Sequence, residues 1–95
     1  MKRPDGRNKE LNQTYRKLLS EAENQSGAAA KVAAMERAWV TYRDRYMAAM
    51  YPAKDKQTEY GSGYPMEADL LLAQLTEVQI NALEALLKQY APAAH

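Results

Sequence analysis

The stretch from Ala28 to Met50 reads AAAKVAAMERAWVTYRDRYMAAM and decides the fold. It contains neither Gly nor Pro, and Ala and Met both favour helix. Its large apolar residues recur at helical steps, which places them on one face. They are Met35, Trp39, Tyr42, Tyr46 and Met50. Trp39 is the only tryptophan, and because such a side chain buries roughly 150 to 250 Å², we predict that it anchors the core.

Helical spacing also appears on both sides of this stretch. Before it, residues 9 to 24 place a row of apolar side chains on one helix face. That row is Leu11, Tyr15, Leu18, Leu19 and Ala22. After it, residues 66 to 90 carry a wider apolar face that Pro92 terminates. Pro4 and Gly6 predict a flexible arm over residues 1 to 8, and we expect a flexible tail over residues 91 to 95.

Two breaks separate these predicted helices. The polar residues 24 to 27 form a short break that favours an antiparallel hairpin, with Ser26 as a candidate cap of the following helix. Residues 51 to 65 form a longer segment with room for a short extra helix. We therefore predict an all-α protein, a single domain over residues 1 to 95. Its expected architecture is a three-helix up-down-up bundle with one long loop between helices two and three.

The charge balance does not favour nucleic acid or an acidic membrane surface as a partner. The chain has 13 basic and 12 acidic side chains, a net charge of +1. Residues 1 to 50 hold ten basic and six acidic side chains, whereas residues 51 to 95 hold three basic and six acidic ones. Either two packed halves neutralise each other, or a basic N-terminal face meets an acidic partner. No run approaches about 18 apolar residues, so we expect no membrane span, and residues 1 to 6 show no signal peptide.

The side chains that catalysis requires are scarce. There is no Cys, and the only histidine is the terminal His95, so metal sites and nucleophilic triads lack their usual groups. Glu36 and Asp44 would lie roughly 12 Å apart along a helix, which is long for a glycosidase pair. The glycines match no phosphate-binding pattern. We predict no enzyme, no metal and no cofactor.

Residues 36 to 44, ERAWVTYRD, resemble the Q-R-x-W-[ILV]-x-[FY]-R-D signature of the lysozyme inhibitor LprI-like family. This family comprises small helical bacterial proteins, mostly secreted or periplasmic. Upstream, ELNQTYRKL at residues 10 to 18 is similar to the family's E-L-N-x-x-Y-x-x-L opening. Downstream, a Gly-Ser-Gly turn at residues 61 to 63 precedes Leu75-Thr76, as in the family's G-G-S … L-T-x-x-R close. The three pieces follow the family order over most of the chain.

Two departures from the family pattern stand out. The family's usual cysteines are replaced, by Met47 and by an apolar residue near Leu71. The arginine of L-T-x-x-R falls at Gln79, so an ion pair made by that arginine is expected to be absent.

The resemblance implies a small protein-binding module without enzymatic activity. The family name implies lysozyme as the partner, inhibited by steric blockage of its cleft. It also implies a periplasmic or secreted protein if a signal peptide was removed, the alternative being a cytoplasmic one. From the residues, the alternative function is a structural or helper subunit that completes a larger complex through the wide apolar face of its last helix.

The segment from Tyr51 to Pro65 is the candidate contact surface, since its tyrosines lie among flexible glycines. These side chains either pack over an open end of the bundle or form an adaptable contact loop. The candidate partner-binding residues are Tyr51, Lys56, Tyr60 and Tyr64.

The signature residues are interpreted as structural. Arg43 lies one helical turn after Trp39 and can place its guanidinium on the indole. For Asp44 the candidate partners are Arg37, a cation of the first helix (Lys17 or Arg16), or a backbone donor. The full set is Leu11, Asn12, Tyr15, Arg37, Trp39, Tyr42, Arg43 and Asp44.

Overall fold

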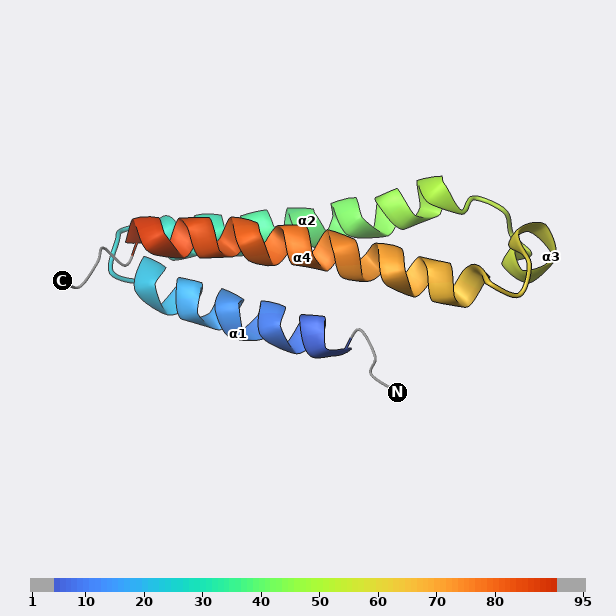
Figure 1. The fold of residues 1–95 in the computed structure, drawn as a ribbon. Coiled ribbons are helices and arrows are strands. Elements are labelled where there is room, and N and C mark those ends of the chain that lie inside the picture. The colour runs from blue at the N-terminus through green and yellow to red at the C-terminus, as the bar shows by residue number, and fades with distance from the viewer. Residues whose placement is uncertain (1–4, 91–95) are drawn as a thin grey trace.

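The computed structural model describes residues 5 to 90, which form four helices and no strand. They are α1 (Asp5–Ala22), α2 (Ala28–Met50), α3 (Lys56–Tyr60) and α4 (Tyr64–Tyr90). The long helices α1 and α4 run in one direction and α2 runs in the other, while the short α3 lies at one end of the molecule (Figure 1). The principal extents are 53 × 28 × 14 Å. The all-helical class is confirmed, with α3 as a fourth helix inside the predicted loop.

The bounds of α2 agree with the sequence, because both of its ends carry strong local signals. Gly27 precedes it in the left-handed region, with φ of 78°, which glycine adopts at little cost. Pro52 follows Tyr51 and disfavours helical geometry before it. No side chain caps the start of α2, so the expected cap by Ser26 is not formed.

The first helix begins at Asp5, four residues before the predicted start. Arg7 in its first turn forms an ion pair with Glu77 of α4, so a contact with a distant part of the chain accompanies this turn. The predicted arm is therefore helical from residue 5 onward. Residues 1 to 4 and the predicted tail at residues 91 to 95 lie outside the described part of the chain.

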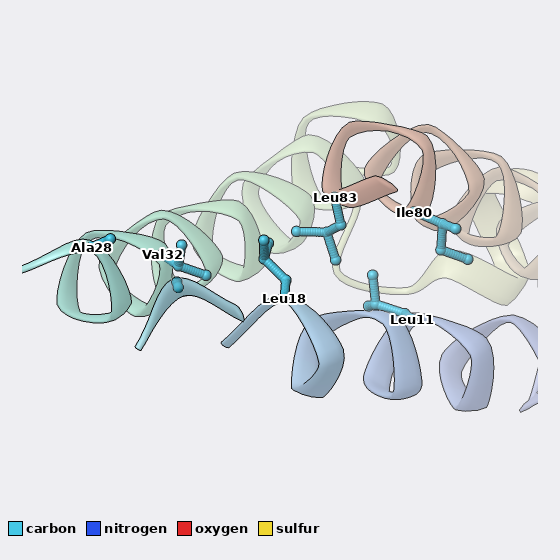
Figure 2. Close-up of a cluster of buried hydrophobic side chains, with 7 residues drawn as sticks. Leu11, Leu18, Ala28, Val32, Ile80 and Leu83 are labelled. Carbon is cyan, nitrogen blue, oxygen red and sulfur yellow. The ribbon is translucent and has the colours of Figure 1, made fainter. Parts of the chain in front are cut away.

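The core lies where α1, α2 and α4 run side by side (Figure 2). Leu18 of α1 and Leu83 of α4 are fully buried, and Ile80 lies beside them. Burying a side chain of this size stabilises the fold by roughly 1.5 to 3 kcal/mol. The buried apolar residues are Leu11, Leu18, Ala22, Ala28, Val32, Ile80 and Leu83.

Trp39 does not anchor this core, contrary to our expectation. Together with Met35 it is half-buried and packs on the margin of the buried cluster. Farther along the same stripe, Tyr42, Tyr46 and Met50 are 55%, 38% and 52% exposed. The reason is the length of α1, which begins level with Glu77, near the middle of α4. We call residues 40 to 74, which extend beyond that level, the distal arm (Figure 1).

Among the described helices, α4 is long and apolar enough to cross a membrane by length and composition. An 18-residue window in it has a mean hydropathy of 1.2 and at most two charged side chains, and 22% of that window is buried. The expectation of no membrane span is therefore not confirmed. A single such helix is weak evidence for a membrane span, because core helices of other proteins meet the same criteria.

Candidate functional site

Three tyrosines form a cluster at the end of the distal arm. The ring of Tyr51 lies edge-on to Tyr60 and Tyr64, with ring centroids 5.2 and 4.8 Å away. The rings of Tyr60 and Tyr64 are 5.8 Å apart. Each such aromatic pair is worth roughly 0.5 to 1.5 kcal/mol beyond the area that it buries. We call these three residues the tip cluster.

Polar contacts of α3 hold the tip cluster in place. Asp55 caps α3 by accepting hydrogen bonds from the backbone N–H of Thr58, at 3.1 Å, and from its hydroxyl, at 2.9 Å. The Tyr60 hydroxyl accepts a hydrogen bond of 3.0 Å from the backbone N–H of Ala53. The ammonium group of Lys56 donates a hydrogen bond to the carbonyl oxygen of Ala53. The tip is therefore ordered by hydrogen bonds among its own residues, 53 to 60.

Two groups at the tip have shifted pKa values. Partial burial raises the pKa of Tyr51 above its ordinary value of 10.0, and the negative charge of Glu67 acts in the same direction. The hydrogen bonds from Thr58 lower the pKa of Asp55 below its ordinary value of 3.8, the backbone donor being the larger cause. Near neutral pH the phenol is thus neutral and the cap carboxylate is charged.

The structure brings all four candidate partner-binding residues to one end of the molecule. Tyr51, Lys56, Tyr60 and Tyr64 are half-buried there. The tyrosines pack on one another and still present part of their surface to solvent. This geometry agrees in part with both interpretations of the segment, as packed side chains and as a contact surface.

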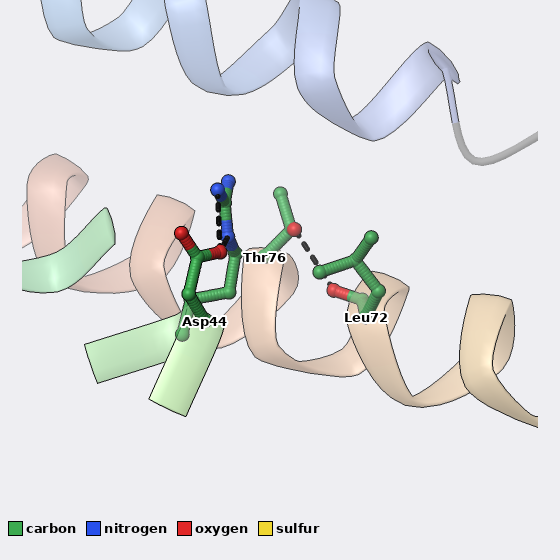
Figure 3. Close-up of polar contacts among 4 residues, drawn as sticks. Asp44, Leu72 and Thr76 are labelled. Atoms are coloured by element: carbon green, nitrogen blue, oxygen red, sulfur yellow. Dashed lines mark hydrogen bonds and ion pairs between the residues drawn. The ribbon is translucent and has the colours of Figure 1, made fainter. Parts of the chain in front are cut away.

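The signature residues Arg43 and Asp44 interact with immediate neighbours. The guanidinium carbon of Arg43 lies 5.3 Å from the centre of the Trp39 ring, as predicted. Asp44 accepts hydrogen bonds of 3.0 and 2.9 Å from Nε and Nη2 of Arg43 (Figure 3). The structure therefore contradicts the partners proposed for Asp44, which were Arg37, Lys17, Arg16 and a backbone donor. A cation of α1 is excluded because that helix begins level with Glu77 and does not extend along the arm.

Of the remaining signature residues, Tyr42 lies exposed in the distal arm, and the others lie along the part of the molecule that holds the core. Leu11 is buried, and Tyr15 packs half-buried against the core. Asn12 and Arg37 are exposed. None of the eight signature residues belongs to the tip cluster, so the signature and the candidate contact surface share no residue.

The sequence analysis missed a link between α2 and α4. Nε2 of Gln79, which is 8% exposed, donates a hydrogen bond of 3.0 Å to Oε1 of Glu36. These are the positions where the quoted patterns place glutamine and arginine. Comparing the two patterns could have suggested the pair, because both positions depart from the pattern in the same chain. One turn earlier on α4, the buried Thr76 donates to the Leu72 carbonyl oxygen (Figure 3).

Comparison with known proteins identifies the family. The family model described as lysozyme inhibitor LprI matches residues 4 to 83. The chain belongs to the lysozyme inhibitor LprI family. The match covers α1, α2, α3 and most of α4, and it confirms the resemblance seen in the three sequence pieces. No curated protein and no solved structure matches this LprI-family chain.

The LprI family is one of inhibitors, and its members are typically extracellular or periplasmic. Within residues 5 to 90 of this member, no group of three or more His, Cys, Asp or Glu side chains is placed to hold a metal ion. A shallow, open groove lies between the start of α1 and the middle of α4. It is lined by Arg7, Leu70, Ala73, Gln74, Glu77 and Val78.

Proposed function

We propose that this LprI-family protein is a protein-binding module without enzymatic activity, which inhibits a lysozyme by placing its tip cluster in the sugar-binding cleft. The supporting observation is the position of the cluster, at the end of an arm on a molecule 53 Å long. An arm of this shape suits a concave partner. Family membership supports the choice of lysozyme.

The tip has the chemistry of a preorganised contact surface. Tyrosine supplies apolar area together with a hydroxyl group, and it loses little conformational entropy on binding. Because the three rings already pack on one another, less order has to be gained when a partner binds. Lys56 adds a cation beside them, and glycosidase clefts hold a pair of carboxyl groups that attract positive charge. Blockage would then be steric, with one cation favouring the correct orientation.

A lysis assay tests this proposal with two matched substitutions. Turbidity of a bacterial cell-wall suspension is followed with chicken-type, goose-type and invertebrate-type lysozymes in the presence of the protein. Tyr64→Ala removes a ring from the tip cluster, while Tyr42→Ala removes an exposed ring on α2 that lies outside it. Circular dichroism verifies that both variants keep the helical content of the unchanged protein.

We expect inhibition of at least one lysozyme class, lost in Tyr64→Ala and kept in Tyr42→Ala. If Tyr42→Ala abolishes inhibition and Tyr64→Ala does not, the contact lies along α2 and the tip assignment fails. The absence of inhibition at micromolar protein against all three classes would refute the lysozyme proposal.

A second candidate function is a structural or helper subunit that completes a larger complex through α4. Its support is the exposure of large apolar side chains on that helix, with Met66, Leu70 and Val78 exposed by 68%, 61% and 68%. Such a subunit would co-purify with a constant partner and would tolerate Tyr64→Ala. A periplasmic or secreted location fits the family, with the cytoplasm as the alternative, and fractionation of the producing cells distinguishes them.

A further inference from the structure

Lys54 lies in the irregular segment between α2 and α3, on a backbone that side chains of α3 hold in place. The backbone N–H of Ala53 donates a hydrogen bond of 3.0 Å to the Tyr60 hydroxyl, and its carbonyl oxygen accepts one from the ammonium group of Lys56. Pro52 restricts the chain just before these contacts, because its ring fixes φ. The peptide group that leads into Lys54 therefore has a defined position.

The residue after Lys54 is also held in place. Asp55 caps α3, and its two carboxylate oxygens accept hydrogen bonds of 3.1 and 2.9 Å from the backbone N–H and the hydroxyl of Thr58. Both oxygens of the neighbouring carboxylate are thus already engaged. Because the backbone is fixed on both sides of Lys54, little backbone order has to be gained when this residue meets a partner.

The side chain of Lys54 itself is exposed. It makes no hydrogen bond or ion pair with any residue between 5 and 90. Lys56, by contrast, is half-buried and directs its ammonium group to the backbone. Of the two lysines in residues 51 to 65, Lys54 is therefore the one that can approach a carboxylate of a partner directly.

Charge in this segment acts at short range. Residues 51 to 65 hold two cations, Lys54 and Lys56, and two carboxylates, Asp55 and Glu59. Because the segment has no net charge, it does not steer a charged partner from a distance. A preference for one partner over another then depends on direct contacts, and a cleft that contains carboxyl groups favours a contact with Lys54.

We propose that Lys54 determines which cleft this protein blocks, by placing its ammonium group between the two carboxyl groups of the lysozyme. This inference rests on the proposed function and names its central contact. In retaining glycosidases the two carboxyl groups are about 5 to 5.5 Å apart. An ammonium group carries three N–H donors on a flexible stem, so one lysine can donate to both carboxyl groups. The polysaccharide is excluded because the general acid and the nucleophile are then both occupied.

Isothermal titration calorimetry of the full chain with chicken-type, goose-type and invertebrate-type lysozymes tests the role of Lys54. Lys54→Gln removes the charge, and Lys54→Arg keeps it. Lys31→Gln is the matched control, at an exposed lysine of α2 next to the buried Val32 and outside the tip. We expect Lys54→Gln to weaken binding about tenfold or more. Lys54→Arg should recover most of that loss, and Lys31→Gln should bind like the unchanged protein.

A double-mutant cycle across the contact tests the assigned partner. In the lysozyme that binds, the general-acid carboxyl group is replaced by its amide. The unchanged protein should bind this lysozyme about tenfold less tightly. Lys54→Gln should bind it no more weakly than it binds the unaltered lysozyme, because the charge pair is already broken.

Tyr60→Phe tests the support beneath Lys54, because it removes the hydroxyl that holds Ala53 and keeps the ring of the tip cluster. This change should weaken binding when Lys54 is present and have no further effect together with Lys54→Gln. Circular dichroism verifies that all variants keep their helical content.

The outcomes separate this inference from the proposed function. If the unchanged protein binds a lysozyme and Lys54→Gln binds it equally well, the role of Lys54 is refuted while inhibition by the tip stands. Additive losses in the cycle with the amide lysozyme would also overturn the inference, because Lys54 would then contact another part of the partner. The absence of binding to all three classes of lysozyme would overturn both proposals.

Discussion

Gln79 joins α4 to α2 through one side-chain hydrogen bond to Glu36, in a part-buried position. A charged acceptor strengthens such a bond, and little water competes for a donor that is 8% exposed. This chain departs from the family pattern at both positions, with Glu36 in place of the pattern's glutamine and Gln79 in place of its arginine. The hydrogen-bond donor is therefore a neutral amide in place of a guanidinium group.

A double-mutant cycle measures this bond. Glu36→Ala, Gln79→Ala and the double variant should give a coupling free energy of about 1 kcal/mol in urea unfolding. The Arg7–Glu77 ion pair is the control cycle, because both of its side chains are nearly half exposed. There the coupling should lie between about 0 and 1 kcal/mol. A coupling near zero for Glu36 and Gln79 would show that the bond has no energetic role.

Helical periodicity predicted which side of α2 is apolar, and Met35 and Trp39 pack against the core on that side as expected. It could not predict that Tyr42 and Met50 remain exposed on that same side. Periodicity describes one helix at a time, whereas burial depends on whether another helix reaches the same level. The contact between Arg43 and Trp39 was predictable because it is local, one turn along a helix.

Among the elements, α2 was the most predictable and α3 the least. Gly27 and Pro52 mark both ends of α2, so its bounds follow from local rules. Five residues are too few to show an apolar period, and the signal for α3 is its cap, Asp55 followed by Thr58. The start of α1 was predicted four residues too late, because Gly6 is typical of a loose arm. The ion pair between Arg7 and Glu77 joins residues far apart in the sequence, so local sequence could not predict it.

The cap of α3 should weaken in acid. Because the pKa of Asp55 is lowered in the folded tip, its stabilising effect is complete above the unfolded value near 3.8 and is lost as pH falls through the lower folded value. The exchange rate of the Thr58 amide, followed by NMR from about pH 7 to about pH 2, should rise in that window after correction for intrinsic exchange. Asp55→Asn caps without titrating, so its corrected rate should stay flat. The same acid response in Asp55→Asn would assign it to another group.

The turn between α1 and α2 should depend on one glycine. Gly27→Ala forces a side chain into the left-handed region and should cost about 1 to 2 kcal/mol of unfolding free energy. Gly63→Ala is the matched control, since Gly63 has no positive φ and an added Cβ meets nothing within 4 Å. We expect that variant to stay within about 0.5 kcal/mol of the unchanged protein. Equal losses in both would mean that backbone strain at Gly27 is unimportant.

At the scale of the whole molecule, stability should fall from the core end to the tip. The buried residues lie on α1, the first turns of α2 and the second half of α4, whereas α3 has none. Amide hydrogen exchange at low protein concentration should therefore show the slowest rates around Leu18, Val32 and Leu83, and faster rates throughout the distal arm. Uniform protection along α2 and α4 would contradict this order.

The short α1 also divides the chain into parts with different freedom to change over evolutionary time. Substitutions at Leu18 or Leu83 disturb a packed interior, where even the loss of a methylene group is felt. Substitutions at the exposed positions beyond the level of Glu77 meet mostly solvent, and such substitutions usually change stability by less than about 0.5 kcal/mol. Descendants of this chain can therefore explore new sequences at the exposed positions of the arm while the same core keeps them folded.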